Sequence, residues 1–258
     1  MKKLLISTLA FSALFAVSCQ KEIDKRLETT PYTIHATIDQ TKTAYSNESA
    51  FSWQAGDQVS LEVISETTGE PNWITLSTTE SGTSANFTSN DISGWIPGDH
   101  AFYPKNQGNN DLTLSVVDNA LQLQLKGTIA YDPENPMACI PLIGYRQSGN
   151  GFAFKTATGI LRFTVSNIPA DANYLALDAD CCLNGYFAVP QDGELSMANA
   201  LQSWGQKYIT FTPAAAGVTM DFYLPIPVGT IPAGATLINS KPGVPTMACF
   251  VQYRSRSG

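Results

Sequence analysis

The sequence predicts an all-β protein, and two observations support this fold class. Apolar and polar residues alternate at every second position in many short runs, which is the pattern of strands with one buried face. Gly, Pro, Asn and Asp separate these runs at short intervals, as they do in turns between antiparallel strands. Such a chain folds as a β-sandwich or a β-barrel, because each sheet has to bury its apolar face.

The first element in chain order, residues 1–18, has the pattern of an export signal peptide. Lys2 and Lys3 precede an apolar stretch from Leu4 to Val17, and the small residue Ser18 follows. A membrane-spanning helix needs about 18 or more apolar residues, and this stretch is shorter. We therefore predict a signal peptide that is removed from the mature chain.

The residues Ala16-Val17-Ser18-Cys19 resemble a bacterial lipobox, in which the cysteine becomes the first mature residue and carries acyl chains such as palmitate. Lipidation of Cys19 is the prediction, and an ordinary apolar residue at the end of the signal is the alternative. A single chain binds a membrane only marginally, at about 0.8 kcal/mol per buried methylene, so a stable anchor needs several. Residues 19–28 are then a lipid-anchored linker.

The stretch from Gln20 to Asp24 resembles the acidic signal that sends some Gram-negative lipoproteins to the outer face of the outer membrane. A solvated linker explains the same residues equally well. The localisation predicted from Cys19 and this stretch is the outer membrane, with the chain lipid-anchored at the cell surface.

Strands are expected where the alternation is strict. In residues 33–38, Ile and Ala alternate with Thr and His. One short helix is expected over residues 195–204, where Leu195, Ala198 and Leu201 recur at helical spacing. The other expected strands cover residues 59–63, 121–125, 161–165, 209–211 and 220–226.

The alternation lapses between Gly127 and Gly151, where Pro and Gly are frequent, and we place a domain boundary there, near Tyr145. The length of the mature chain suits one large domain or two ordinary domains of about 100 to 150 residues each, and two are predicted. The N-terminal domain then covers residues 29–145 and the C-terminal domain covers residues 146–258.

The composition argues against nucleic acid as a partner and against catalysis. The net charge is −7, and no run of basic residues is long enough to hold a phosphate backbone. The two histidines, His35 and His100, occupy ordinary strand and turn positions, and no phosphate-binding glycine motif or zinc-ligand spacing occurs. We therefore predict no enzyme, no cofactor and no bound metal.

Four cysteines follow Cys19 in the mature chain. Neighbouring Cα atoms lie about 3.8 Å apart and a disulfide usually needs about 4.4 to 6.8 Å, so adjacent cysteines do not bond each other. Whether one of the adjacent pair bonds another cysteine stays open. The four are Cys139, Cys181, Cys182 and Cys249.

Several stretches resemble the fimbrillin family, the subunits of pili that are assembled from lipoprotein precursors. The most specific is Thr41–Tyr45 followed by Phe51–Leu61, in which Trp53, Gly56 and Asp57 resemble the family's Trp-x-x-Gly-Asp turn before an apolar strand. The other matching stretches, in the family's order, are Ala101–Pro104, Asn135–Ala138, Phe154–Thr156, Gly159–Val165 and Phe222–Gly229.

The resemblance implies two transthyretin-like β-sandwich domains in tandem and a role as a structural subunit or anchor of fimbria-like pili, with cell adhesion as its outcome. It also implies assembly by strand exchange, in which a protease cuts after a basic residue near the N-terminus, the first strand leaves and a strand of another subunit fills the exposed groove. Arg26 is the candidate cut site here, and a solvated basic pair with Lys25 is the alternative. The expected partners are other fimbrial subunits, the outer membrane through acylated Cys19, and ligands on host or bacterial surfaces.

One departure from the family pattern and one alternative function stay open. A Pro- and Gly-bearing stretch, Lys241–Pro245, interrupts the region where the family continues with regular strands, so the C-terminal domain is expected to have an incomplete last sheet. A glycan-binding outer-membrane lipoprotein is the alternative function, with aromatic side chains stacking on sugars. The tryptophans considered for it are Trp53, Trp73, Trp95 and Trp204, for which packing over the core is the other explanation.

Overall fold

The computed structural model describes residues 31–39, 51–90, 92–105, 113–118, 120–135, 138–190, 194–213, 215–232, 236–238 and 250–252. The chain divides into residues 1–30 and residues 31–258. The predicted signal peptide, Cys19, the linker and Arg26 all lie outside the described residues. Within the described part, no helix has the length and apolar character needed to cross a membrane.

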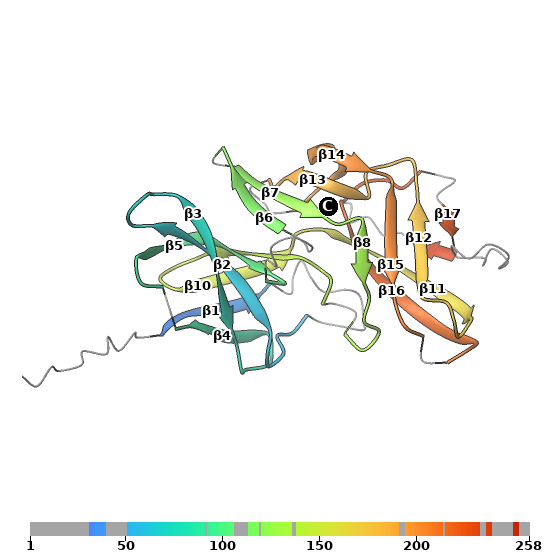
Figure 1. Ribbon diagram of the computed structural model, residues 1–258, viewed down its shortest axis with the longest axis horizontal. Helices are drawn as coiled ribbons and strands as arrows, with labels where there is room; N and C mark the ends of the chain where they lie inside the picture. Colours follow the sequence, from blue (N-terminus) through green and yellow to red (C-terminus); the bar gives the residue numbers. More distant parts are fainter. Residues whose placement is uncertain are drawn as a thin grey trace, which may run out of the picture. The chain divides into compact units, whose positions relative to one another are not determined.

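The described residues are all-β, as the sequence predicts, and seven of their strands form a closed barrel (Figure 1). The ring closes weakly between β3 and β4, which share the single residue pair Ser77–Thr88. In ring order the strands are β1 (Tyr32–Ile38), β10 (Gly151–Thr156), β9 (Leu142–Arg146), β5 (Trp95–Tyr103), β2 (Gln58–Ser65), β3 (Pro71–Ser77) and β4 (Ser84–Ser89).

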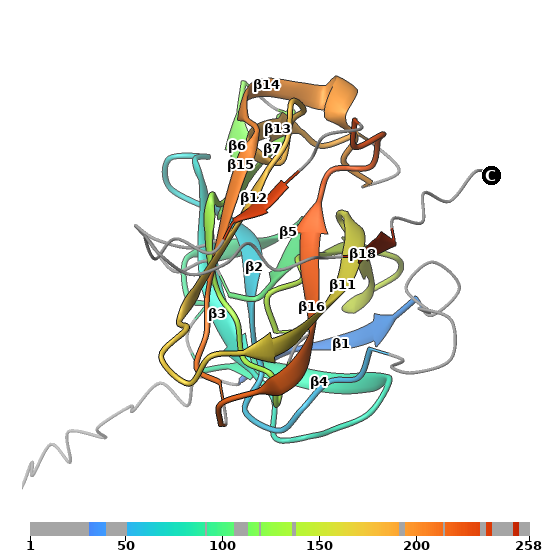
Figure 2. The ribbon, with the colours of Figure 1, turned by 90° about the vertical axis from the view of Figure 1, so that its right-hand side faces the viewer.

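Three further sheets are open. The first is ordered β16 (Val218–Ile226), β11 (Gly159–Ile168), β18 (Phe250–Gln252), and Figure 2 shows β11 and β16 side by side. The second is ordered β17 (Thr236–Ile238), β12 (Tyr174–Asp178), β15 (Gln206–Thr210), β8 (Thr128–Ala130). The third is ordered β14 (Ala200–Trp204), β13 (Asn184–Ala188), β7 (Ala120–Leu125), β6 (Thr113–Val117).

The strands expected from alternation are confirmed, and their apolar positions are buried. Ile34 and Ala36 of β1 and Leu161 of β11 have no exposed surface, while their polar neighbours face outwards. Alternation works here because each of these strands has one face on a core and one towards solvent. The sandwich-like arrangement of the sheets follows from this pattern.

The helix expected over residues 195–204 is wrong. A single 3₁₀ turn, η1 (Met197–Asn199), is followed directly by β14. The Asn199 side-chain oxygen accepts hydrogen bonds from the Ser196 backbone N–H at 3.0 Å and from the Ser196 hydroxyl at 2.6 Å, which holds the turn. Pairing of β14 with β13 then outweighs the helical spacing of three apolar residues.

Strands pair across the predicted boundary near residue 145. β10 follows it in sequence but lies next to β1, and β7 precedes it but pairs with β13. β8 likewise pairs with β15. Each half of the chain thus contributes strands to sheets of the other half. The division into domains of residues 29–145 and 146–258 stays a prediction.

Buried apolar residues form three clusters. One fills the barrel around Trp53 and Phe87, and a second lies between β11, β16 and their neighbouring strands around Phe163 and Phe222. The third joins barrel strands β5 and β9 to the β14–β13–β7–β6 sheet. Its buried members are Phe102, Leu114, Leu123, Leu125, Ile143, Ala157, Phe187 and Leu195.

Candidate functional site

β1 is the first described strand of the chain, and it is bonded to a neighbouring strand on both sides (Figure 1). It runs antiparallel to β4 and parallel to β10. At its C-terminal end the Ile38 N–H donates to the Thr83 carbonyl oxygen at 2.9 Å, and the Asp39 N–H donates to the Phe154 carbonyl oxygen at 2.7 Å.

The inward side chains of β1 fill an apolar groove. Ile34, Ala36 and Ile38 are 0%, 0% and 6% exposed. Ile34 pairs with Phe87 of β4, and Ile38 pairs with Phe154 of β10. Burying each isoleucine contributes about 1.5–3 kcal/mol, so Ile34 and Ile38 hold β1 in the barrel.

Polar contacts hold the first half of β1 to the Asn150 turn and to β4. The Tyr32 hydroxyl donates to Asn150 Oδ1 at 3.0 Å, and Asn150 Nδ2 donates to the Thr33 carbonyl oxygen at 3.0 Å. His35 Nδ1 lies 3.2 Å from Asn86 Oδ1. These contacts fix the register of β1, since a shift by one residue would move its apolar side chains to solvent.

The Trp53–Gly56–Asp57 turn packs beneath the end of this groove. Trp53 is 1% exposed and meets Phe87, Phe154 and Tyr103 edge-on, with ring centroids 4.9, 5.1 and 5.5 Å apart. Gly56 has a φ of +97°, a conformation that favours glycine. The turn therefore places the Trp53 side chain in the barrel core.

The Asp57 carboxylate ties the turn to strand β5. It accepts hydrogen bonds from the Gln54 backbone N–H at 2.8 Å and from the Tyr103 hydroxyl at 3.2 Å. Burial raises the pKa of Asp57, and these two hydrogen bonds oppose that change without cancelling it. Burial next to this carboxylate also raises the pKa of Tyr103 well above its usual value, so the phenol keeps its proton and donates.

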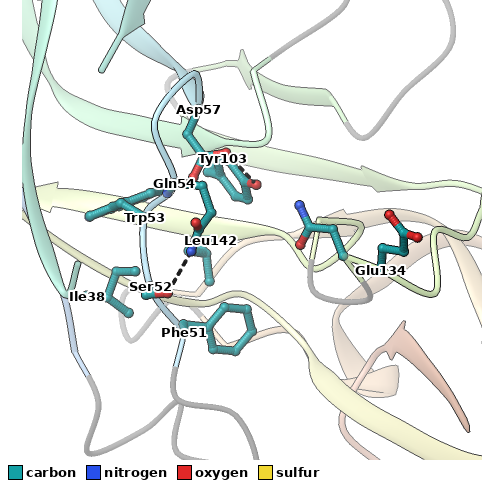
Figure 3. Close-up of a pocket in the computed structure, with 10 residues that line it drawn as sticks. Ile38, Phe51, Ser52, Trp53, Gln54, Asp57, Tyr103, Glu134 and Leu142 are labelled. Atoms are coloured by element: carbon teal, nitrogen blue, oxygen red, sulfur yellow. Dashed lines mark hydrogen bonds between the residues drawn. The ribbon is translucent and has the colours of Figure 1, made fainter. Parts of the chain in front are cut away.

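A cavity of about 370 Å³ opens between the turn and the last residue of β1 (Figure 3). Gln54 Nε2 donates to the Ser52 hydroxyl at 3.0 Å on one wall, and Glu134 lies on the opposite side. The walls are mixed polar and apolar. They are formed by Ile38, Phe51, Ser52, Trp53, Gln54, Asp57, Tyr103, Glu134, Asn135 and Leu142.

A histidine–carboxylate contact on the barrel was not found by sequence reasoning. His100 Nδ1 lies 2.6 Å from Glu62 Oε2, and Glu62 is only 8% exposed. The Glu62 side chain covers Gly98, where an added Cβ would lie 2.7 Å from Glu62 Cγ. The two partners are 38 residues apart, and the register shift between β2 and β5 brings them together, which no local pattern reveals.

A second feature missed by sequence reasoning is the buried Lys207 on β15. Its side chain has no exposed surface, and desolvation lowers its pKa to about 7. Its Nζ donates to the Leu183 carbonyl oxygen at 3.5 Å, and no acidic side chain within the described residues pairs with it. Burial raises the pKa of the Cys139 thiol to about 11, and Cys139 interacts electrostatically with Lys207.

The remaining sequence candidates are dispersed. Trp53 is buried, Trp73 and Trp95 are half-buried on β3 and β5, and Trp204 on β14 is 50% exposed, so the four do not form one stacking platform. Cys181 and Cys182 are half-buried free thiols, Cys139 is half-buried, and Cys249 lies outside the described residues. No group of three or more metal-ligating side chains occurs in the ranges that the structure describes.

Comparison with known proteins leaves the family open. No family model matches the chain, and no curated protein matches it. A solved structure of a proposed cell adhesion protein from Bacteroides ovatus has 15% identity and a TM-score of 0.41, covering 87% of this chain and 86% of that one. A proposed adhesin from the same species has 10% identity and a TM-score of 0.33, covering 85% and 80%. Similarity this low establishes neither family nor function for this chain.

Proposed function

We propose that the chain is a lipid-anchored cell-surface subunit of a fimbria-like assembly, in which subunits join by strand exchange at the position of β1. The observation that carries the proposal is the setting of β1, the first described strand, which is bonded on both sides and buries alternate apolar residues. A donated strand with the same alternation would satisfy the backbone groups of β4 and β10 and refill the groove. The proposal assigns no catalytic residue and no cofactor, and adhesion is the expected outcome of assembly.

The position of the cut decides what is released. Arg26 precedes β1, so a cut after Arg26 separates the chain from a lipid anchor at Cys19 but leaves β1 joined to the barrel. Lys42 follows β1 and is the only Lys or Arg between Arg26 and Lys105. We assign the groove-opening cut to Lys42, because cutting there frees β1 from the rest of the chain.

Assembly after proteolysis tests the proposal. The mature chain with Cys19→Ala is treated with a protease that cuts after Lys and Arg under native conditions, and the products are separated in SDS without boiling. We expect SDS-resistant ladders from this protein and from its Arg26→Gln variant, but a single band from Lys42→Gln. A product that stays strictly monomeric after β1 has been released contradicts the proposal.

A further inference from the structure

We propose that the outward face of the β14–β13–β7–β6 sheet binds a neutral polysaccharide. The binding surface, called here the amide–aromatic face, consists of Gln122, Gln124, Tyr186, Gln202 and Trp204. Figure 1 and Figure 2 both show these strands side by side as one sheet. The site is distinct from the β1 groove, so it does not depend on strand exchange.

The register of the sheet places these side chains together. Gln124, Tyr186 and Gln202 are directly paired across β7, β13 and β14, so they form one row on one face. Gln122 and Trp204 lie two positions along their strands from this row and share its face. Leu123, Leu125 and Phe187, which are next to the row on β7 and β13, are buried on the other side of the sheet.

The opposite side of the same sheet is a packed core, which leaves the amide–aromatic face towards solvent. Leu123 and Phe187, which pair with each other, are buried in the cluster that joins this sheet to the barrel. Ser203 lies between Gln202 and Trp204 and donates to Cys182 Sγ at 2.9 Å. Tyr186 is 38% exposed and Trp204 is 50% exposed.

The sheet carries no formal charge, although the chain is acidic. The sequences of its four strands, TLSVV, ALQLQL, NGYFA and ALQSW, contain no Asp, Glu, Lys, Arg or His, whereas the chain has a net charge of −7. Exposed apolar side chains concentrate on the same strands. Of six large exposed hydrophobic residues in the described ranges, four are Val117, Tyr186, Leu201 and Trp204, and the others are Ile64 and Ile96.

This combination fits the chemistry of an uncharged sugar chain. The glutamine amides both donate and accept hydrogen bonds, as sugar hydroxyls do. The exposed rings of Tyr186 and Trp204 offer flat apolar surfaces for the C–H faces of sugar rings. A charged polymer would find no ion-pairing partner on these strands, and the negative charge of the chain disfavours an anionic one.

The size of the face suits several sugar units of a chain. Neighbouring strands are about 4.8 Å apart, and alternate residues on one strand are about 6.7 Å apart, so three strands present a patch longer and wider than one ring. An open sheet face contacts the side of a polymer rather than enclosing its end. We therefore assign a polysaccharide, not a monosaccharide, as the ligand.

The test uses the uncut mature chain with Cys19→Ala, so that a failure of strand exchange does not affect it. Dextran, mannan and galactan are the neutral probes, heparin is the anionic comparison, and binding is followed by tryptophan fluorescence and by retention in affinity gels. We expect at least one neutral probe to bind and heparin not to bind. Tyr186→Ala and Trp204→Ala should each weaken that binding about tenfold, as the loss of one stacking contact predicts.

Two further variants separate recognition from folding. Gln124→Glu introduces a charge with almost no change of shape and should abolish binding while the circular dichroism spectrum stays unchanged. Ile96→Ala, which removes an equally exposed apolar residue from β5, should leave binding unchanged. The proposal is overturned if none of the three neutral polysaccharides binds, if the face variants bind as well as the parent, or if the face instead mediates association of two copies.

Discussion

Trp53 is the largest fully buried side chain of the described residues. It is fully buried among Phe87, Phe154 and Tyr103, and three of the barrel strands contribute its neighbours. Its Nε1 is buried and has no hydrogen-bond partner within the described residues. The indole is therefore retained for its packing and not for a polar contact.

We predict that Trp53→Ala lowers the free energy of unfolding by about 3–5 kcal/mol, because it leaves a cavity at the centre of the aromatic cluster. Trp53→Phe should cost less, since it keeps a ring and removes the buried N–H that lacks a partner. Urea unfolding followed by circular dichroism measures both. A loss below about 1 kcal/mol for Trp53→Ala would show that the turn does not organise the core.

Replacing Lys207 is expected to stabilise the protein, in contrast to replacing Trp53, because burying the lysine opposes folding. Replacing it with Met keeps the length of the side chain and removes the desolvation penalty. We predict that Lys207→Met raises the free energy of unfolding at pH 7 by at least about 2 kcal/mol. Thermal unfolding of the two proteins gives the difference.

The effect of Lys207 depends on pH with a defined sign. The pKa of Lys207 is about 7 in the folded protein, against 10.5 for an ordinary lysine, so the unfolded chain binds more protons between these values. Above pH 10.5 the lysine is neutral in the folded and the unfolded chain, so its burial does not lower the free energy of unfolding. As the pH falls from 10.5 towards 7, the unfolded chain takes up a proton that the folded protein does not, and the free energy of unfolding decreases. The advantage of Lys207→Met should therefore shrink from pH 7 to pH 10. An advantage that is constant over this range would contradict the burial of the lysine.

Residues with local patterns could be predicted from the sequence, and residues with distant partners could not. The Trp-x-x-Gly-Asp spacing pointed to Trp53, Gly56 and Asp57 because a turn and the residue beside it are neighbours in sequence. The contact between Glu62 and His100 depends on strand register. Register is set by the whole sheet, so no short motif carries it.

At the scale of elements, the β13–β14 pairing is irregular and leaves no room for a side chain at Gly185. Gly185 has a φ of +133°, and an added Cβ would lie within 2.0 Å of the Gln202 carbonyl oxygen. The pairing also shifts register between Tyr186 and Phe187, as in a β-bulge. The shift lies next to the Tyr186–Gln202 pair, at one end of the amide–aromatic face.

We predict that Gly185→Ala lowers the free energy of unfolding by more than about 2 kcal/mol, because the added methyl group clashes with backbone as well as straining φ. Gly69→Ala is the matched control, since Gly69 has a φ of +74° and nothing within 4 Å of an added Cβ. It should cost about 1 kcal/mol. Equal losses in the two variants would show that the close approach of β14 is absent.

Element prediction from the sequence succeeded where one face of a strand is buried and failed where that pattern is lost. β1, β7 and β11 alternate and were found. β9 was missed, because its first three residues are all buried and no alternation remains. β14 was mistaken for a helix, because a bulge disturbs its period of two.

At the scale of the whole molecule, strand pairing links sequence-distant parts of the chain. Composition and alternation predicted the all-β class. They did not predict that β7, β8 and β10 pair with strands on the other side of residue 145. Pairing partners are chosen by the total burial of all sheets, which a one-dimensional pattern does not contain. The closed barrel and the open sheets also have different consequences, since a barrel accepts a new strand only after one of its own has left.

Strand complementation tests the account most directly. The mature chain with Cys19→Ala is cut after Lys42, the released fragment is removed in denaturant, and a synthetic peptide of residues 31–39 is added on refolding. We predict that the peptide binds in a one-to-one complex and restores the thermal stability of the uncut protein, whereas a peptide with Ile34→Asp and Ile38→Asp does neither. If the cut chain is as stable without the peptide, or if both peptides act alike, the β1 groove is not a strand-acceptor site.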